Sequence, residues 1–162
     1  MQKNKALFLD RDGVINRERG EYTFKVEDFE ILPDVIKSLQ LAQEKGYKLI
    51  VITNQGGIAK GIYTHEDVAK AHQYLSEELA KSNVILTDIF YSPHHQDYSK
   101  SLDRKPDSLM LEKAIAIYNI DPNQSIMVGD SERDIIASEK VGVKGIKIKP
   151  NSSIFDIVQN QL

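Results

Sequence analysis

Two aspartates separated by one residue follow the first apolar run of the chain. The run Ala6–Leu9 is followed by Asp10, Arg11, Asp12 and Gly13. Two carboxylates at this spacing can divide the work on a phosphate ester. Asp10 would be the nucleophile that forms an aspartyl-phosphate, and Asp12 the general acid that protonates the leaving oxygen and then activates water. Because Gly13 allows the backbone to turn sharply, the segment predicts phosphomonoester hydrolysis.

Three other positions carry residue types that phosphate chemistry uses. The run Leu49–Ile52 ends at Thr53, the run Ser125–Val128 is followed by Asp130, and Lys105 lies at a loop-to-helix junction. Ligands of open parallel sheets bind outside the carboxyl ends of the strands, so these side chains are expected at one site. Lys105 would neutralise phosphate charge and the Thr53 hydroxyl would donate to the transferring oxygens. The predicted catalytic residues are Asp10, Asp12, Thr53 and Lys105.

Several carboxylates that converge without a cation would repel one another, and some would take up protons. Mg²⁺ prefers oxygen ligands and binds through a few carboxylates together with substrate phosphate. We therefore expect Mg²⁺ as the cofactor, with Asp10, Asp12 and Asp130 as its ligands. If the first strand continues that far, alternation would place residues 10 and 12 on one side and would point Arg11 away from the metal as a structural residue.

Short apolar runs alternate with helical patterns along the chain, which predicts α/β architecture with a parallel sheet. The predicted strands are 6–9, 49–52, 84–91, 125–128 and 143–148, and the predicted helices lie near 33–45, 64–81, 107–119 and 131–140. Segment 151–162 is expected to form a short helix or a frayed tail. In the helix at 64–81, Thr64 and Asp67 predict an N-terminal cap. His72 is expected at the surface or half-buried, and Tyr63 as a packing residue.

The motifs "DRDGVIN", "VITNQGGIAKG", "RKP" and "VGDSERD" resemble, in this order, the four motifs of the haloacid dehalogenase superfamily. The resemblance covers nearly the whole chain and implies a three-layer Rossmann-like α/β/α fold with strand order 5-4-1-2-3. Only about twenty residues separate Gly13 from the first helix, too few for a cap domain with its own core. We therefore expect a capless phosphatase domain over residues 1–162, screened by loops 14–32 and 92–105.

Within the superfamily the chain resembles the D-glycero-D-manno-heptose 1,7-bisphosphate 7-phosphatases, with the histidinol-phosphate phosphatases as a sister group and alternative. "DRDGVIN", "TNQGGIAKGIY" and "SPHH…DRKP" carry this finer match. The resemblance implies that Arg104 recognises the phosphate that is not cleaved. It further implies that the substrate is lined by Glu18, Arg19, Gly20, Glu21, Tyr22, Thr53, Asn54, Gln55 and Gly56, next to Lys105. Arg17 and Lys60 are further charged groups expected near this open site.

The chain departs from these phosphatases at two places: a structural zinc site and one charged position beside the substrate. These phosphatases usually hold a structural zinc before "RKP" through cysteines and a histidine, where this chain has Ser92, His94, Ser101 and Asp103. Since the chain has no cysteine, we expect no zinc, and we expect hydrogen bonds from the serines and histidines to hold the loop. Ser131 stands where these phosphatases often have lysine, which removes one charge beside the substrate.

The composition of the chain limits which binding partners and which cellular location we expect. The 162 residues carry a formal net charge of −3, which argues against a general nucleic-acid or anionic-membrane binder. The absence of cysteine and of a signal or membrane-spanning segment favours the cytoplasm. We expect a monomer acting on a small phosphorylated metabolite. A competing class is the signalling receiver domain, which also uses aspartates, Thr and Lys around Mg²⁺. Its phosphorylated Asp follows the third strand, whereas the third predicted strand here leads into "YSPHH".

Overall fold

The computed structural model describes residues 2–162, which fold around one five-stranded parallel sheet. The strands lie in the order β3-β2-β1-β4-β5, the order that the family resemblance implies. Receiver domains follow the order 2-1-3-4-5 instead, so the observed topology argues against that class. The bounds are β1 Lys5–Leu9, β2 Tyr47–Asn54, β3 Asp88–Ser92, β4 Ile126–Gly129 and β5 Lys144–Lys147.

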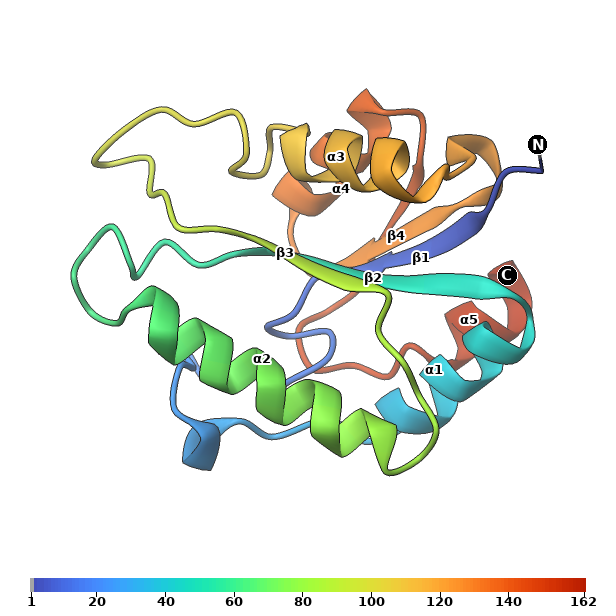
Figure 1. Cartoon of the computed structure of the whole chain (residues 1–162), viewed down its shortest axis with the longest axis horizontal. Coiled ribbons are helices and arrows are strands. Elements are labelled where there is room, and N and C mark those ends of the chain that lie inside the picture. Colours follow the sequence, from blue (N-terminus) through green and yellow to red (C-terminus); the bar gives the residue numbers. More distant parts are fainter. Residues whose placement is uncertain (1) are drawn as a thin grey trace.

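Helices cover both faces of the sheet, as Figure 1 shows: α3 and α4 lie on one face, and α1, α2 and α5 on the other. The helices are α1 Val35–Glu44, α2 His65–Ala80, α3 Leu109–Tyr118, α4 Glu132–Lys140 and α5 Phe155–Gln161, with short 3₁₀ turns η1 Val26–Asp28 and η2 Pro122–Gln124. The α/β prediction is therefore confirmed. Segment 151–162 forms the helix rather than a frayed tail. None of the helices within residues 2–162 has the length and apolar character needed to cross a membrane.

Each face of the sheet has its own apolar core because side chains alternate along the strands. On β1, Leu7 and Leu9 pack toward α1, α2 and α5, whereas Ala6 and Phe8 pack toward α3 and α4. All four side chains are fully buried. A strand buried on both faces and flanked by β2 and β4 is a rigid support for whatever follows Leu9.

Two local expectations had different outcomes. The cap at the start of α2 is confirmed: the Thr64 hydroxyl accepts from the Asp67 N–H, and the Asp67 carboxylate accepts from the Thr64 N–H. The expectation for His72 was wrong, because its side chain is buried and faces the sheet side of α2. The periodicity of the helix shows which face His72 occupies, but it does not show that a buried polar partner from a distant segment lies against that face.

Candidate active site

A cleft of about 630 Å³ opens at the carboxyl ends of β1, β2 and β4. One wall comes from the loop after β1, which contributes Glu18, Gly20, Glu21 and Tyr22. The opposite wall comes from the loop after β3, through His95 and Arg104. The floor carries Asp10, Lys105 and Asp130, three of the side chains predicted from the sequence. The cleft therefore lies where the sheet topology predicts a ligand site.

Lys105 joins two buried carboxylates on the floor of the cleft. Its Nζ donates to Asp10 Oδ1 at 2.9 Å, to Asp134 Oδ1 at 2.5 Å and to the Ile52 carbonyl at 2.7 Å. Only 2 % of Lys105 is exposed. Asn54 holds its main chain from both sides, because Asn54 Oδ1 accepts from Lys105 N–H and Asn54 Nδ2 donates to Lys105 C=O. A buried ammonium group with three acceptors is fully saturated.

Two glycines let the carboxylates approach this closely. Gly13 has φ +84°, and a Cβ there would lie 2.1 Å from Asp130 Oδ2. A Cβ on Gly129 would lie 2.2 Å from Asp134 Cβ. Asp134 in turn caps α4, since its Oδ2 accepts from the Ser131 N–H while its other oxygen meets Lys105. Replacing either glycine would push an acidic side chain away from the floor.

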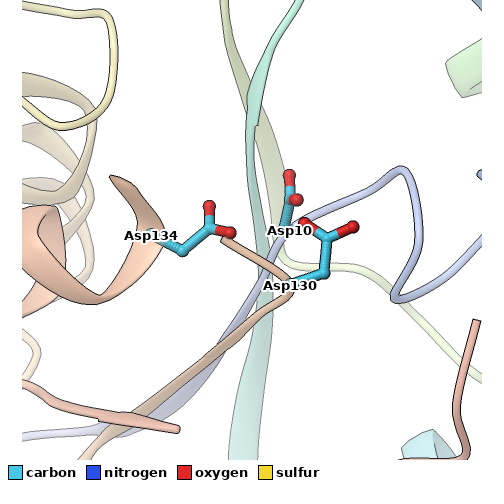
Figure 2. Close-up of side chains that lie close together, drawn as sticks. All are labelled: Asp10, Asp130 and Asp134. Carbon is cyan, nitrogen blue, oxygen red and sulfur yellow. The ribbon is translucent and has the colours of Figure 1, made fainter. Parts of the chain in front are cut away.

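Figure 2 shows the carboxylates of Asp10, Asp130 and Asp134 gathered at the ends of β1 and β4 and the start of α4. One oxygen from each lies within 4.8 Å of the others. Burial raises the pKa of Asp10 well above its usual range; Lys105 opposes this rise, and the charges of Asp134, Asp130 and Asp12 add to it. Burial also raises the pKa of Asp130. This donor set is hard, anionic and short of positive charge, and it fits a divalent cation such as Mg²⁺.

The cluster differs from the predicted ligand set in one member. The Asp12 carboxylate does not belong to it, and Asp134 does. Strand β1 ends at Leu9, so the alternation that would have placed residues 10 and 12 on one side stops before Asp12. The condition that the strand continues to residue 12 is not met, although Asp10 and Asp12 both line the cleft. Asp12 as a metal ligand stays a prediction.

Asp12 is held by side chains instead. Its Oδ1 accepts from Arg11 Nη2 and from Asn16 Nδ2, both at 2.9 Å, and its Oδ2 accepts from Gln55 Nε2 at 3.2 Å. Burial would raise the pKa of Asp12, but the Arg11 charge and the hydrogen bonds from Asn16 and Gln55 outweigh it and hold this pKa below its usual range. Asp12 is thus a fixed, ionised carboxylate on the cleft surface, and the same contacts that fix it oppose its protonation in the free site.

The remaining predicted residues fall into two groups. Gly20, Glu21, Tyr22, Asn54, Gln55, Gly56 and Arg104 line the cleft together with Glu18. Thr53 is buried beneath it, where its hydroxyl accepts from Gln55 Nε2 at 3.0 Å. Arg19 turns toward the loop itself, 3.2 Å from Glu21 and 3.4 Å from Asp28. Arg17 pairs with Glu30, and Lys60 lies over the Tyr22 ring.

Five cleft residues were absent from the predicted site: Thr23, His95, Ser131, Arg133 and Asp134. Asp134 stood in the fourth motif, so the signal was present but its role was left open. Arg133 precedes it on α4 and lies near Arg104: burial lowers the pKa of Arg104, and the Arg133 charge lowers it further. Two cations therefore face the mouth of the cleft, although Ser131 itself carries no charge. Nothing in the local pattern distinguishes Arg133 from a solvent-exposed helix residue.

Hydrogen bonds hold the loop before Lys105, as expected. Asp103 Oδ1 accepts from Ser92 Oγ at 2.7 Å and from Ser101 Oγ at 2.6 Å. His94 Nε2 lies 3.9 Å from Asp103 Oδ2, and the His94 carbonyl accepts from Arg104 Nη1 at 2.9 Å. Ser92, His94, Ser101 and Asp103, the four positions where the resemblance implies zinc ligands, thus form one polar cluster around Asp103.

This chain is similar in sequence and fold to known phosphatases. The sequence model of the haloacid dehalogenase-like hydrolase family matches residues 2–142. A D-glycero-beta-D-manno-heptose-1,7-bisphosphate 7-phosphatase of Haemophilus ducreyi is 40 % identical over 146 residues, 86 % of this chain and 80 % of the relative. A D-glycero-alpha-D-manno-heptose-1,7-bisphosphate 7-phosphatase of Photorhabdus laumondii is 42 % identical over 151 residues, which is 88 % of this chain and 82 % of the relative. The solved D,D-heptose 1,7-bisphosphate phosphatase of B. bronchiseptica, complexed with magnesium and phosphate, has a TM-score of 0.85 at 25 % identity and covers 98 % of this chain and 87 % of that chain.

Proposed function

The chain belongs to the haloacid dehalogenase-like hydrolases and is a phosphatase, and we propose that it removes the 7-phosphate of D-glycero-D-manno-heptose 1,7-bisphosphate. The observation that carries the proposal is the meeting of Lys105 and Asp10 on the floor of an open cleft, 2.9 Å apart. A carboxylate can attack a phosphate ester only where positive charge offsets the repulsion between the two. Lys105 supplies part of that charge.

The roles follow from the contacts of each side chain. Asp10, at the end of a rigid strand, attacks phosphorus; the P–O bond to the sugar breaks and an aspartyl-phosphate forms. Asp12 gives a proton to the departing sugar oxygen, then takes one from the water that cleaves the acyl-phosphate, which frees Asp10 and phosphate. Because the pKa of Asp12 is lowered in the free site, the proton for the first step is taken up together with the substrate. Thr53, whose hydroxyl accepts from Gln55 Nε2 beneath the cleft, is assigned to donate that hydroxyl to the transferring oxygens.

Asp10 and Asp130, with Asp134 beside them, are the residues that would hold Mg²⁺. When bound, the ion supplies charge neutralisation for the phosphoryl oxygens and keeps the buried carboxylates ionised at neutral pH. The magnesium in the B. bronchiseptica structure supports Mg²⁺ as the ion. The absence of a zinc ion stays a prediction from the missing cysteines.

The second phosphate of the substrate is assigned to the mouth of the cleft. Arg104 reaches it from the loop after β3, and Arg133 faces the same region from α4. The Glu18–Tyr22 loop closes the other side and is pinned by Asn151, whose side chain accepts from Glu18 N–H and donates to Glu18 C=O. A substrate with two separated phosphates would span the distance between this mouth and Lys105.

We also propose a domain organisation, an oligomeric state and a cellular location for this chain. One sheet with two continuous cores supports a single phosphatase domain over residues 1–162. The monomeric state and the cytoplasmic location rest on composition alone, as does the expectation that nucleic acid and membranes are not partners.

The test compares kcat/KM on both heptose bisphosphate anomers and on histidinol phosphate, with Mg²⁺ present. We expect one heptose anomer to be preferred, and Asp10→Asn to lose turnover of every ester. The beta-anomer and alpha-anomer enzymes are similarly identical to this chain, so sequence identity does not choose between the anomers and the experiment does. Preference for histidinol phosphate would overturn the substrate but not the mechanism. A single stoichiometric phosphorylation without turnover would overturn the enzyme and restore the receiver-domain alternative.

A further inference from the structure

Arg11 is the largest fully buried side chain among residues 2–162. Its guanidinium lies beside the site rather than in it: Nη2 donates to Asp12 Oδ1 at 2.9 Å and to the Thr23 carbonyl at 2.7 Å. The face of the group packs 5.4 Å from the centre of the Phe29 ring. Its Nε has no hydrogen-bond partner, so the orientation of the group depends on what its two Nη atoms contact.

The contact of Nη1 is His72, one of the buried residues of helix α2. The two nitrogens, Arg11 Nη1 and His72 Nε2, are 3.2 Å apart. Arginine can only donate, so Nε2 must accept, and the imidazole must be neutral with its proton on Nδ1. Burial, with the Arg11 charge adding to it, lowers the pKa of His72 to about 3. The edge of the imidazole also meets the Tyr91 ring, with centroids 5.9 Å apart.

From this chain of contacts we propose that His72 is a positioning residue for Asp12 and acts through Arg11. The proposal rests on the proposed function, because it assumes that Asp12 transfers the proton. His72 does not touch the cleft; it is absent from the residues that line it. By accepting from Nη1 it fixes the rotation of the guanidinium, and the guanidinium then fixes one oxygen of the carboxylate.

A second arm holds the other oxygen of Asp12 and limits the size of the effect. Tyr63 Oη donates to Gln55 Oε1 at 2.7 Å, and Gln55 Nε2 donates to Asp12 Oδ2. Loss of His72 therefore loosens Asp12 without releasing it. Removing groups that orient a reacting side chain typically costs about 10- to 100-fold in activity, and we expect the lower end of that range.

The experiment uses the dependence on the leaving group. His72→Leu keeps a similar volume but removes the acceptor, and His72→Gln offers an amide oxygen in its place. A sugar alkoxide needs a proton as it departs, whereas p-nitrophenolate departs without one. We expect His72→Leu to lower kcat/KM on heptose 1,7-bisphosphate about 10-fold and to leave kcat/KM on p-nitrophenyl phosphate within about 2-fold of wild type. His72→Gln should restore most of the loss.

A matched control separates positioning from stability. Leu75 is fully buried one turn further along the same helix, so Leu75→Ala should lower stability while changing kcat/KM on the two esters in equal proportion. Should His72→Leu fail to fold, ¹⁵N NMR of the wild-type imidazole gives an independent answer. We expect Nδ1 to carry the proton and Nε2 to be unprotonated from pH 5 to pH 8.

Distinct results overturn the two ideas. Equal losses of His72→Leu on both esters, no loss on either, or an Nε2 that carries the proton would remove the positioning role while leaving the enzyme intact. Failure of the wild-type protein to hydrolyse either ester with Mg²⁺ would instead overturn the proposed function on which this role depends.

Discussion

At the residue scale, the main electrostatic feature of the site is that carboxylates outnumber cationic groups on the floor of the cleft. Lys105 contacts two acidic side chains, and their charges, although opposed by burial, raise its pKa. One ammonium group cannot neutralise Asp10, Asp130 and Asp134 together, so the floor of the cleft keeps a net negative charge. A phosphate ester would be repelled from this floor without further positive charge. Arg104 and Arg133 lie at the mouth, where their positive charge can attract the substrate without reducing the nucleophilicity of Asp10.

Arg104→Ala tests the assignment of the second phosphate. We expect KM for the bisphosphate to rise about 10- to 100-fold, because a charge-assisted contact to phosphate is worth about 1.5–3 kcal/mol. KM for a monophosphate of the same sugar should change far less. Steady-state kinetics on the two substrates give the comparison, and Arg17→Ala is the matched control, since Arg17 pairs with Glu30 away from the cleft. Equal rises for both substrates would remove Arg104 from this role.

At the scale of elements, three strand ends and one loop have to meet. β1 and β4 pair directly, which brings Asp10 and Asp130 to adjacent positions. β2 brings Asn54, which holds Lys105 by two hydrogen bonds. The loop after β3 carries both Arg104 and Lys105, and it needs support beyond this contact at its end. The cluster around Asp103 provides that support through hydroxyl groups from both ends of the loop.

Asp103→Ala should therefore loosen the loop as a unit. We expect faster amide hydrogen exchange across residues 92–104 and a several-fold loss of kcat/KM, while Asp103→Asn, which keeps an acceptor oxygen, loses less. Exchange measured by mass spectrometry gives the readout, with Asp97→Ala as control because the Asp97 carboxylate is largely exposed in the same loop. Unchanged exchange in Asp103→Ala would show that packing, not this cluster, orders the loop.

At the scale of the whole molecule, ligand binding and protonation both act on the free energy of unfolding. Asp10 has a raised pKa without a cation, so the folded chain binds this proton more tightly than the unfolded chain, and the resulting stability is lost as pH rises through the folded pKa. A divalent cation needs the ionised carboxylates, so it should stabilise the fold most at the higher pH, where that proton has left.

We expect Mg²⁺ at a hundred times its Kd to stabilise the fold by about 2.7 kcal/mol, which raises Tm by about 5–10 °C. The rise should be larger at pH 8 than at pH 5, and EDTA should reverse it. Thermal unfolding followed by circular dichroism measures both. Asp130→Asn should lose most of the rise, and Asp156→Asn, an exposed position on α5, should keep it. The same rise in Asp130→Asn as in wild type would place the cation elsewhere.

His72 contributes a pH dependence of the opposite sign. Its folded pKa is about 3, so the unfolded chain binds the extra proton below pH 6.5, and stability falls as pH drops. Relative to His72→Gln, wild type should lose about 2 kcal/mol between pH 6.5 and pH 4.5. Urea unfolding at several pH values measures the difference, in which the titration of Asp10 is common to both proteins. A constant difference would mean that His72 has the same pKa in the folded and unfolded chains.

The sequence by itself determined the architecture and most of the floor of the site. Apolar runs buried on both faces have to be central parallel strands, and chemistry-bearing residues directly after them, Asp10 and Asp130, have to meet at one edge. The strand order and the cleft-lining loop Glu18–Tyr22 were implied by the family resemblance of the motifs, not by the local patterns themselves.

Only the tertiary structure decided which side chains face one another. It placed Asp134 rather than Asp12 in the carboxylate cluster, because β1 ends before alternation can reach residue 12. It buried His72 against Arg11, sixty-one positions away, and brought Arg133 beside Arg104. Periodicity states which face of an element a residue occupies, but the partner on that face comes from a distant segment. Its identity depends on side-chain direction and packing, which no local pattern contains.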